Sequence, residues 1–328
     1  MVTKTLPGLL IALSAFFILQ LNTADASGKN KEDLSDRSIK PSEAIVLGVI
    51  EGVTEYLPVS STGHLILASN ALGLSEYKKD PAEGESPLIK VPALEAYQIV
   101  IQLGAILAVL GLYRKHVFSI LRGVMGKDPD GVRLLILLII AFLPAAIVGL
   151  LTRDFLQTHL FTPISVAVAL ALGGVLMIVV ERWYEGDKNQ ERQLCSNVVD
   201  LSYLQALSIG LFQCLALCPG TSRSMVTIVG ALIVGVHIVA AAEFSFLLAL
   251  PTLGAATFYE GAMNWNTLIT ETGRTSLFLG LAISMIVAAI SIKWLLHWLK
   301  SHGLTPFGFY RIGIAAVVLL YFTVVLSP

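Results

Sequence analysis

The sequence predicts an all-α integral membrane protein, a polytopic helical bundle, from its composition and from the length of its apolar runs. The 328 residues are 55% hydrophobic and 14% charged, with a mean hydropathy of +0.77. Soluble domains carry roughly 25% charged residues. The apolar runs are continuous and about twenty residues long, which is the length that a helix needs to cross a bilayer. The net charge of −1 says nothing about partners, but the lack of a basic cluster or stripe argues against a nucleic-acid partner.

The N-terminal 41 residues differ from the rest of the chain. An apolar run followed by the A-x-A pattern of Ala24 and Ala26 predicts either a signal peptide over residues 1–26 or an extra N-terminal membrane span. Residues 27–41 are rich in charge and predict an exposed linker. We therefore expect the membrane domain to occupy residues 42–328.

Eight apolar segments follow, of two kinds. Six strong segments predict membrane-spanning helices: residues 92–113, 132–151, 164–183, 240–259, 276–299 and 309–326. Two weaker segments, residues 42–74 and 201–238, begin apolar, break at a cluster of Pro, Gly and Ser, and resume apolar. Each half is too short to span a membrane comfortably. We therefore expect two re-entrant helical hairpins, which are tolerated where they line a polar cavity.

Loop charges predict the orientation, because cytoplasmic loops carry more Lys and Arg than external ones. The 113–133 connection holds five basic residues and the 184–200 loop holds two, so we expect both in the cytoplasm. The 260–275 loop has one Arg against two Glu and is expected outside. Six crossings fit these loops if the first interrupted segment enters from outside and the second from the cytoplasm.

The two interrupted segments also resemble each other in sequence. Gly48 aligns with Gly210, each is followed three positions later by Glu or Gln, and each segment then reaches a proline and a run of hydroxyls. A repeat whose copies enter from opposite sides is an inverted-topology repeat, and its site lies near the shared interface. We expect the two copies over residues 42–183 and 201–326.

The first interrupted segment contains EGVTEYLPVSSTGHLIL. Glu51 and Glu55 are four positions apart, so a helix places both on one face about 6 Å apart. A carboxylate within a span costs roughly 3 kcal/mol or more, so this pair requires a partner. The pair could bind a divalent cation, share a proton or pair with an Arg from elsewhere; an exposed helix end is the plain structural alternative.

Ser61 and His64 follow the acidic pair in the same segment. A lone histidine is more often structural than catalytic. Here it lies among hydroxyls and near two carboxylates, and histidine is the commonest proton-transfer residue. This setting favours a role for His64 in the chemistry.

The second interrupted segment contains CPGTSRSMVT. Gly220 lets the backbone approach a ligand, while the hydroxyls of Ser222, Ser224 and Thr227 and the amides of a helix start form an anion cradle. Arg223 adds a planar fork suited to phosphate oxygens. An ordinary turn in which Ser caps a helix explains a serine but not a buried arginine.

Two carboxylates, a histidine, several hydroxyls and an arginine together indicate phosphoryl transfer, in which cationic groups neutralise phosphate charge. The membrane setting indicates a lipid phosphate or diphosphate as substrate. A serine hydroxyl, the histidine or a metal-bound water could be the attacking group, and the sequence leaves this choice open.

At these motifs the sequence resembles the undecaprenyl-diphosphate phosphatase family, the BacA-type enzymes. EGVTEYLPVSSTGH is similar to the family's E/Q-x-x-x-E segment with its following S-S-T-G-H, and PGTSRSMVT is similar to its P-G-x-S-R-S-x-x-T segment. The resemblance covers about residues 42–326. It implies hydrolysis of undecaprenyl diphosphate to undecaprenyl phosphate and orthophosphate, which recycles the lipid carrier for cell-wall synthesis and confers bacitracin resistance.

The resemblance also implies roles for single residues. Glu51 and Glu55 would hold a divalent cation, Mg²⁺ or Ca²⁺, which prefer oxygen ligands. The expected catalytic residues are Glu55, Ser61, His64 and Arg223. The residues expected to bind the phosphates are Gly220, Ser222, Arg223, Ser224 and Thr227.

Four positions depart from the family pattern. Met225 and Val226 replace a small Gly-Ala pair, which predicts different packing behind the phosphate loop. Cys218 stands where an aromatic residue is usual, and His237 where a basic residue often follows. We expect none of the four to touch the chemistry.

The resemblance further implies a multi-pass protein of the bacterial cytoplasmic (inner) membrane, with its active site facing the periplasm or cell exterior. The expected partners are a polyprenyl diphosphate lipid and the membrane, and a homodimer is left open. The alternative function is a transporter or flippase of an anionic polyprenyl lipid, because inverted repeats with broken helices are typical of transporters. The acid-phosphatase-like lipid phosphatases are excluded, because Val229 stands where they carry a histidine.

Overall fold

The computed structural model describes residues 38–77, 88–90, 94–160, 162–187, 194–263 and 272–325. The expected signal peptide or extra span over residues 1–26 lies outside the described residues, as does the expected linker up to residue 37.

Helices dominate this part of the chain. In chain order the elements are α2 (Pro41–Thr54), α3 (Ser61–Ala71), β1 (Ser75–Tyr77), β2 (Leu88–Lys90), α4 (Leu94–Leu112), α5 (Arg114–Val124), α6 (Pro129–His159), α7 (Pro163–Asp187), α8 (Tyr203–Gln213), the 3₁₀ turn η2 (Cys214–Leu217), α9 (Arg223–Ile233), α10 (Ile238–Met263), α12 (Arg274–Leu299) and α13 (Thr305–Val325). The strands β1 and β2 form a small antiparallel hairpin with Glu76 opposite Ile89.

Among the described residues, five helices have the length and apolar composition of membrane spans. They are Leu94–Leu112, Pro129–Thr152, Ile164–Tyr184, Ile238–Tyr259 and Arg274–Leu299. They match five of the six predicted spans, which confirms the all-α polytopic membrane class. The sixth predicted span, residues 309–326, falls on α13, whose apolar part Thr305–Tyr321 is shorter than the other five.

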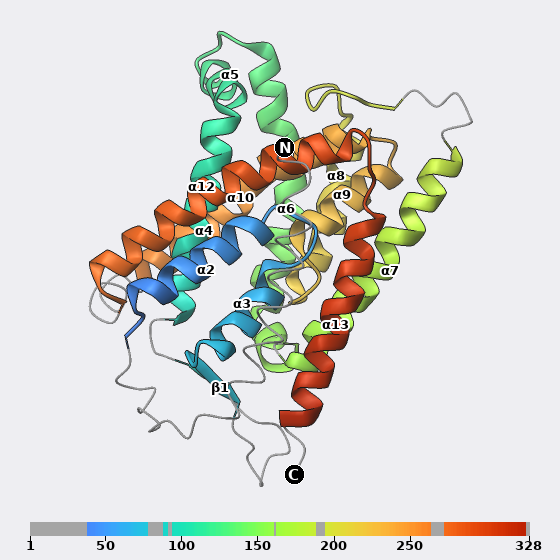
Figure 1. The fold of residues 1–328 in the computed structure, drawn as a ribbon. Helices are drawn as coiled ribbons and strands as arrows, with labels where there is room; N and C mark the ends of the chain where they lie inside the picture. Colours follow the sequence, from blue (N-terminus) through green and yellow to red (C-terminus); the bar gives the residue numbers. More distant parts are fainter. Residues whose placement is uncertain are drawn as a thin grey trace.

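Both interrupted segments form a helix, a break and a second helix, as their sequences predict. Helices α2 and α3 are joined by residues 55–60, which we call the first break. Helices α8 and α9 are joined by η2 and then by residues 218–222, which we call the second break. In Figure 1 the pair α2 and α3 is drawn in blue and the pair α8 and α9 in gold. Their re-entry into the membrane and their opposite orientation stay predictions.

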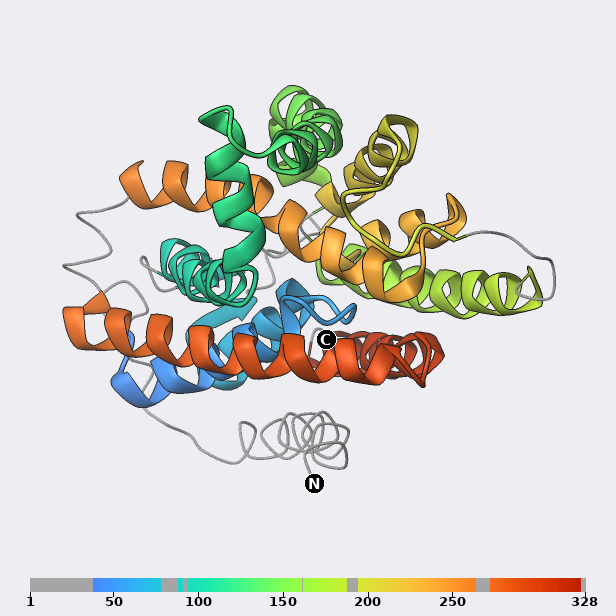
Figure 2. The same ribbon diagram turned by 90° about the horizontal axis from the view of Figure 1, so that it is seen from above.

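The first helix of each interrupted segment packs along a long helix from the other half of the chain. Helix α2 lies beside α12, as both views show, and α8 packs against α6 (Figures 1 and 2). A Cβ on Gly48 would stand 2.7 Å from the Gly280 carbonyl oxygen, and one on Gly210 would stand 2.6 Å from the Ala141 carbonyl oxygen. The two glycines that align in sequence therefore each allow a close helix contact, while the repeat itself stays a prediction.

The basic 113–133 connection contains a helix, α5, which the sequence did not predict. It ends before Asp128, which caps α6. The Ser119 hydroxyl donates to Asp128 Oδ2 (2.8 Å) and the Gly131 amide donates to Oδ1 (3.2 Å). These hydrogen bonds lower the pKa of Asp128, because they stabilise its charged form.

Candidate active site

The second helix of each interrupted segment begins at a serine in an unusual backbone conformation. Ser60 has φ 72° and Ser222 has φ 74°, and they are the non-glycine residues with positive φ in the described part of the chain. Each Oγ accepts a hydrogen bond (3.4 Å) from an amide in the next helical turn, at Gly63 and Met225 respectively. Such strained positions persist where the surrounding structure enforces them and often occur at functional sites.

The two breaks meet around a cavity of about 160 Å³ whose wall carries many polar side chains, and we call it the polar cavity. The charged and polar side chains on its wall come from both interrupted segments and from α4: Glu55, Ser60, Ser61, Thr62, Gln102, Ser222 and Arg223. Of the predicted site residues, the structure thus places Glu55, Ser61, Gly220, Ser222 and Arg223 on one wall. Gln102, in the middle of an apolar helix, is a wall residue that the sequence analysis missed.

Glu55 joins the two predicted motifs. Arg223 Nη2 donates to Glu55 Oε1 (3.0 Å), although the two residues are 168 positions apart, and the Ser61 hydroxyl donates to Glu55 Oε2 (2.7 Å). The Arg223 side chain is 8% exposed and that of Glu55 is 5% exposed. A buried charge requires a partner. Among the options that the sequence left open for the acidic pair, the structure contains the pairing with an arginine.

Other contacts hold the guanidinium in place. Arg223 Nη1 donates to the Ser245 carbonyl oxygen (2.8 Å), and the guanidinium carbon lies 5.5 Å from the ring centroid of Tyr56, within range of a cation–π contact. Arg223 Nε is buried and has no partner among the described residues. Arg223 nevertheless belongs to the wall of the polar cavity.

Glu51 lies one helical turn before Glu55 and is buried behind the wall of the polar cavity. Its Oε1 atom has no hydrogen-bond partner in the described part of the chain. The aligned residue of the second segment, Gln213, does have partners: its amide donates to the Ala141 carbonyl oxygen (3.4 Å) and accepts from Thr252 (3.3 Å). Of these two aligned residues, only Glu51 therefore has a buried side-chain oxygen without a hydrogen-bond partner among the described residues.

Ser224 and Thr227 are completely buried and do not line the polar cavity. The Ser224 hydroxyl donates to the Leu57 carbonyl oxygen (3.0 Å), and the hydroxyls of Thr227 and Ser245 are 2.7 Å apart. Ser224 thus ties α9 to the first break, and Thr227 ties α9 to α10. Their expected contact with phosphate stays a prediction, and the described geometry makes them supports of Arg223.

His64 also lies away from the polar cavity. It is completely buried, and its ring stacks on Tyr310 at a centroid distance of 5.7 Å. Its Nδ1 donates to the Ser60 carbonyl oxygen (2.7 Å), which leaves Nε2 to accept from the Tyr310 hydroxyl (2.8 Å). Both ring nitrogens are thus engaged, and the contact to Ser60 makes His64 a support of the first break.

Arg311 is a further residue of the site that the sequence analysis missed. Its side chain is completely buried on α13 and donates to five carbonyl oxygens at 3.0–3.3 Å, those of Pro58, Ala169, Leu170, Gly220 and Thr221. These carbonyls belong to the first break, to α7 and to the second break, so Arg311 holds the two breaks together. The signal that could have found it is an arginine within an apolar run.

The second break also packs tightly against α7. Gly220 has φ 89°, and a Cβ there would stand 2.5 Å from the Val166 carbonyl oxygen. This position requires glycine for its backbone conformation and for the close approach.

Three of the four positions that depart from the family pattern line a second cavity, which lies behind this turn. Cys218, Met225 and Val226 belong to its wall, which encloses about 630 Å³ and is otherwise almost entirely apolar. Cys218 lines the polar cavity as well. It is therefore nearer to the site than the sequence analysis expected.

These features define a polytopic helical membrane protein whose cavity presents a serine, a carboxylate and an arginine from two broken helices. The family model described as "Bacitracin resistance protein BacA" matches residues 44–317, and the chain belongs to this family. It is 46% identical to a protein of Sorangium cellulosum over 278 residues, which are 84% of this chain and 85% of that protein. It is 41% identical to a protein of Rhizorhabdus wittichii (84% of this chain, 96% of the relative) and 42% identical to one of Nitrosomonas europaea (85% and 93%). All three relatives are named undecaprenyl-diphosphatase.

Proposed function

We propose that this protein hydrolyses undecaprenyl diphosphate to undecaprenyl phosphate and orthophosphate at the polar cavity. The observation that carries the proposal is the contact of Glu55 with both Ser61 and Arg223, which combines a hydroxyl, a base and a cation in one cavity. Membership of the family and the names of the three relatives support the same activity.

The polar cavity is built to bind a phosphate group. Ser60 and Ser222 cap α3 and α9, so the N-termini of both helices adjoin the cavity, and the partial positive charge of such ends favours anions. The Arg223 guanidinium, which belongs to the cavity wall, donates to the terminal phosphate and stabilises charge as it develops on the oxygens.

Ser61 is the nucleophile in this proposal. Its Oγ attacks the terminal phosphorus, its proton passes to Glu55 Oε2, and the bond from phosphorus to the bridging oxygen breaks. Undecaprenyl phosphate leaves with the bridging oxygen. Glu55 passes the serine proton to the departing undecaprenyl phosphate and is again a carboxylate. Water then attacks the phosphoserine and gives a proton to Glu55, the bond from phosphorus to Ser61 Oγ breaks, and Glu55 returns the proton to Ser61 Oγ as orthophosphate is released. The 2.7 Å contact favours Ser61 over His64, which does not line the polar cavity.

The acidic pair fits a divalent cation shared with the substrate. Glu51 Oε1 is a buried oxygen without a partner among the described residues, and Glu55 lies one turn further along. The described residues contain no cluster of three or more His, Cys, Asp or Glu. Mg²⁺ is commonly held by one or two carboxylates together with substrate phosphates and water, so Glu51 and Glu55 would hold the ion. When bound, it neutralises phosphate charge.

We place this activity in the bacterial cytoplasmic membrane, with the polar cavity open to the periplasm or exterior. Hydrolysis there returns the lipid carrier to cell-wall synthesis and lowers the amount of diphosphate that bacitracin can sequester. A homodimer remains compatible with this proposal.

The test is orthophosphate release from undecaprenyl diphosphate by the purified full-length chain in detergent, where transport is not measurable. We expect turnover by the parent, loss of most activity after EDTA, and restoration by Mg²⁺ or Ca²⁺. Glu55→Gln and Ser61→Ala should each lose most of kcat, and only the parent should accumulate a phosphoserine when the reaction is quenched early. No turnover by a well-folded parent would favour the transporter, and an active Ser61→Ala would assign the attack to water.

A further inference from the structure

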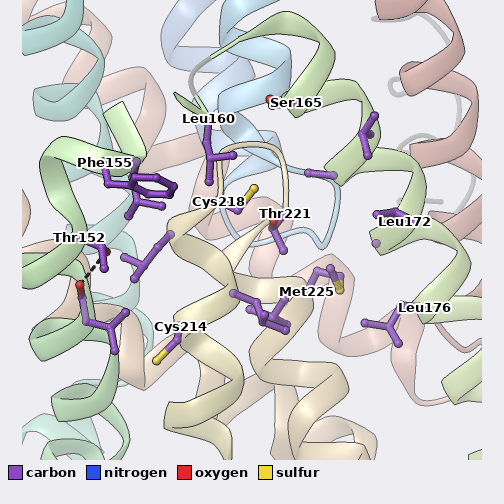
Figure 3. Close-up of a pocket in the computed structure, with 18 residues that line it drawn as sticks. Thr152, Phe155, Leu160, Ser165, Leu172, Leu176, Cys214, Cys218, Thr221 and Met225 are labelled. Carbon is purple, nitrogen blue, oxygen red and sulfur yellow. Dashed lines mark hydrogen bonds between the residues drawn. The ribbon is translucent and has the colours of Figure 1, made fainter. Parts of the chain in front are cut away.

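The apolar cavity beside the site is a candidate binding site in its own right. It encloses about 630 Å³, within the roughly 300–1,000 Å³ of small-molecule pockets. Its walls come from α6, α7, η2 and α9 (Figure 3). Figure 3 shows side chains of α6 such as Phe155 facing those of α7 such as Leu172, with Cys218 and Thr221 on the turn between them.

The chemistry of the wall selects an apolar ligand. The Thr152 hydroxyl donates to the Val148 carbonyl oxygen (2.7 Å), and the Ser165 hydroxyl is bonded to that of Thr162 (2.9 Å). These hydroxyls are thus satisfied within the protein. No charged residue belongs to the described wall. A headgroup would find few partners here, whereas a hydrocarbon chain gains roughly 0.8 kcal/mol for each methylene removed from water.

The cavity opens toward lipid. Its rim includes Phe155, which is 60% exposed, Leu172, which is 65% exposed, and Leu215, which is 51% exposed. Leu172 lies within the Ile164–Tyr184 span. Apolar side chains exposed on a span face hydrocarbon. A lipid chain can therefore enter from the side without crossing water.

The apolar cavity adjoins the polar cavity at the turn formed by residues 218–222. Cys218 lines both, and Thr221 lines the apolar cavity while its neighbours Gly220 and Ser222 line the polar one. The turn at residues 218–222 thus separates a site for phosphate from a site for hydrocarbon. This arrangement matches a molecule whose charged end is joined directly to a long apolar chain.

We propose that this apolar cavity binds the isoprene units nearest the diphosphate of the polyprenyl substrate, an inference that rests on the proposed function. The chain runs from the polar cavity past Cys218, between α6 and α7, and its remainder stays in the bilayer. The cavity thereby selects isoprenoid diphosphates over diphosphates that carry no apolar chain.

Native cysteines provide a direct test on the full-length chain. Cys214 and Cys218 line the apolar cavity, whereas Cys195 lies elsewhere, and all three are free. Labelling with N-ethylmaleimide would be followed by mass spectrometry. Undecaprenyl phosphate should slow labelling of Cys214 by about tenfold or more, inorganic pyrophosphate should not, and Cys195 should be unaffected. Equal protection of Cys214 by a phosphatidate would overturn the proposal, since any lipid chain would then suffice.

Kinetics of cavity-filling variants give a second measure. Thr152→Trp and Leu172→Trp should raise KM for undecaprenyl diphosphate about tenfold or more, because the loss of two or more buried methylenes of the lipid is enough for that change. The kcat of both variants should stay at the parent value. The matched control is Ile286→Trp, an exposed position on α12 away from both cavities. If the parent turns over and both variants keep the parent KM, the chain lies elsewhere. If the parent has no activity, the proposed function fails instead, and the labelling result still decides where the lipid binds.

Discussion

The two breaks share a backbone design but differ in charge and burial. Both begin the next helix at a serine of positive φ, and both give carbonyl oxygens to Arg311. The first break begins with Glu55 and is almost wholly buried. The second break follows the partly exposed turn η2 and leads directly into Arg223, the first residue of α9. The same local backbone conformation is therefore followed by an arginine in the second segment, whereas a carboxylate precedes it in the first. Neither break alone could bind and activate a diphosphate, and the site exists because they meet.

This comparison predicts the largest effect at Arg223. Arg223→Ala removes the cation contributed by the second break and should lower kcat by about 10²–10³, the usual loss for one transition-state donor. Arg223→Lys keeps the charge without the planar fork and should also lose substantial activity. Initial rates with undecaprenyl diphosphate measure both changes.

The control separates chemistry from folding. Arg223→Ala leaves Glu55 buried without its partner, which destabilises a protein by about 3–5 kcal/mol. The double variant Arg223→Ala with Glu55→Gln should recover thermal stability but not activity. A well-folded Arg223→Ala protein with kcat/KM near the parent value would show that the second break does not bind the reacting phosphate.

The next largest effect concerns the residue that joins the breaks. Arg311→Lys removes most of the donors to five buried carbonyl oxygens, and each unsatisfied group costs about 1–3 kcal/mol. The breaks should shift relative to each other, and a displacement of about 1 Å can lower kcat about 10²-fold. Arg133 is the matched control, because it donates to the carbonyl oxygens of Val199 and Leu201 away from the site. Arg133→Lys should lower the melting temperature and leave kcat unchanged; equal kcat losses in both variants would contradict a role specific to the breaks.

A smaller effect is expected at His64, which supports only the first break. His64→Asn should lower kcat about tenfold by loosening Ser60, and the pH profile of kcat/KM should keep the parent's shape. The measurement is that profile for both proteins. Disappearance of one limb in the variant would instead identify His64 as the proton carrier that the sequence suggested.

The last prediction expects no change in activity. It uses thiol labels to test whether the two interrupted segments enter the membrane from opposite sides. In a variant without native cysteines, Lys127→Cys marks the 113–133 connection and Met263→Cys, 70% exposed, marks the start of the 260–275 loop. An impermeant thiol reagent on cells with a permeabilised outer envelope should label only position 263. Labelling at position 127 would contradict the inverted repeat.

The sequence by itself determined the membrane class, the positions of five spans and the location of both breaks. These features can be recognised from local composition, since each span must satisfy its own backbone hydrogen bonds within about twenty apolar residues. It also identified Glu55 and Arg223, because a charge in an apolar run is costly and therefore informative.

Only the tertiary structure decided which groups meet. Glu55 contacts Arg223 across 168 positions, His64 turns toward Tyr310, and Arg311 reaches both breaks. Ser224 and Thr227, which the sequence analysis assigned to phosphate, lie behind the cavity wall. The cost of burying a polar group reveals that it needs a partner, but the partner's identity depends on how helices distant in the chain pack together. That packing, and not the spacing within either motif, determined which side chains face the cavity.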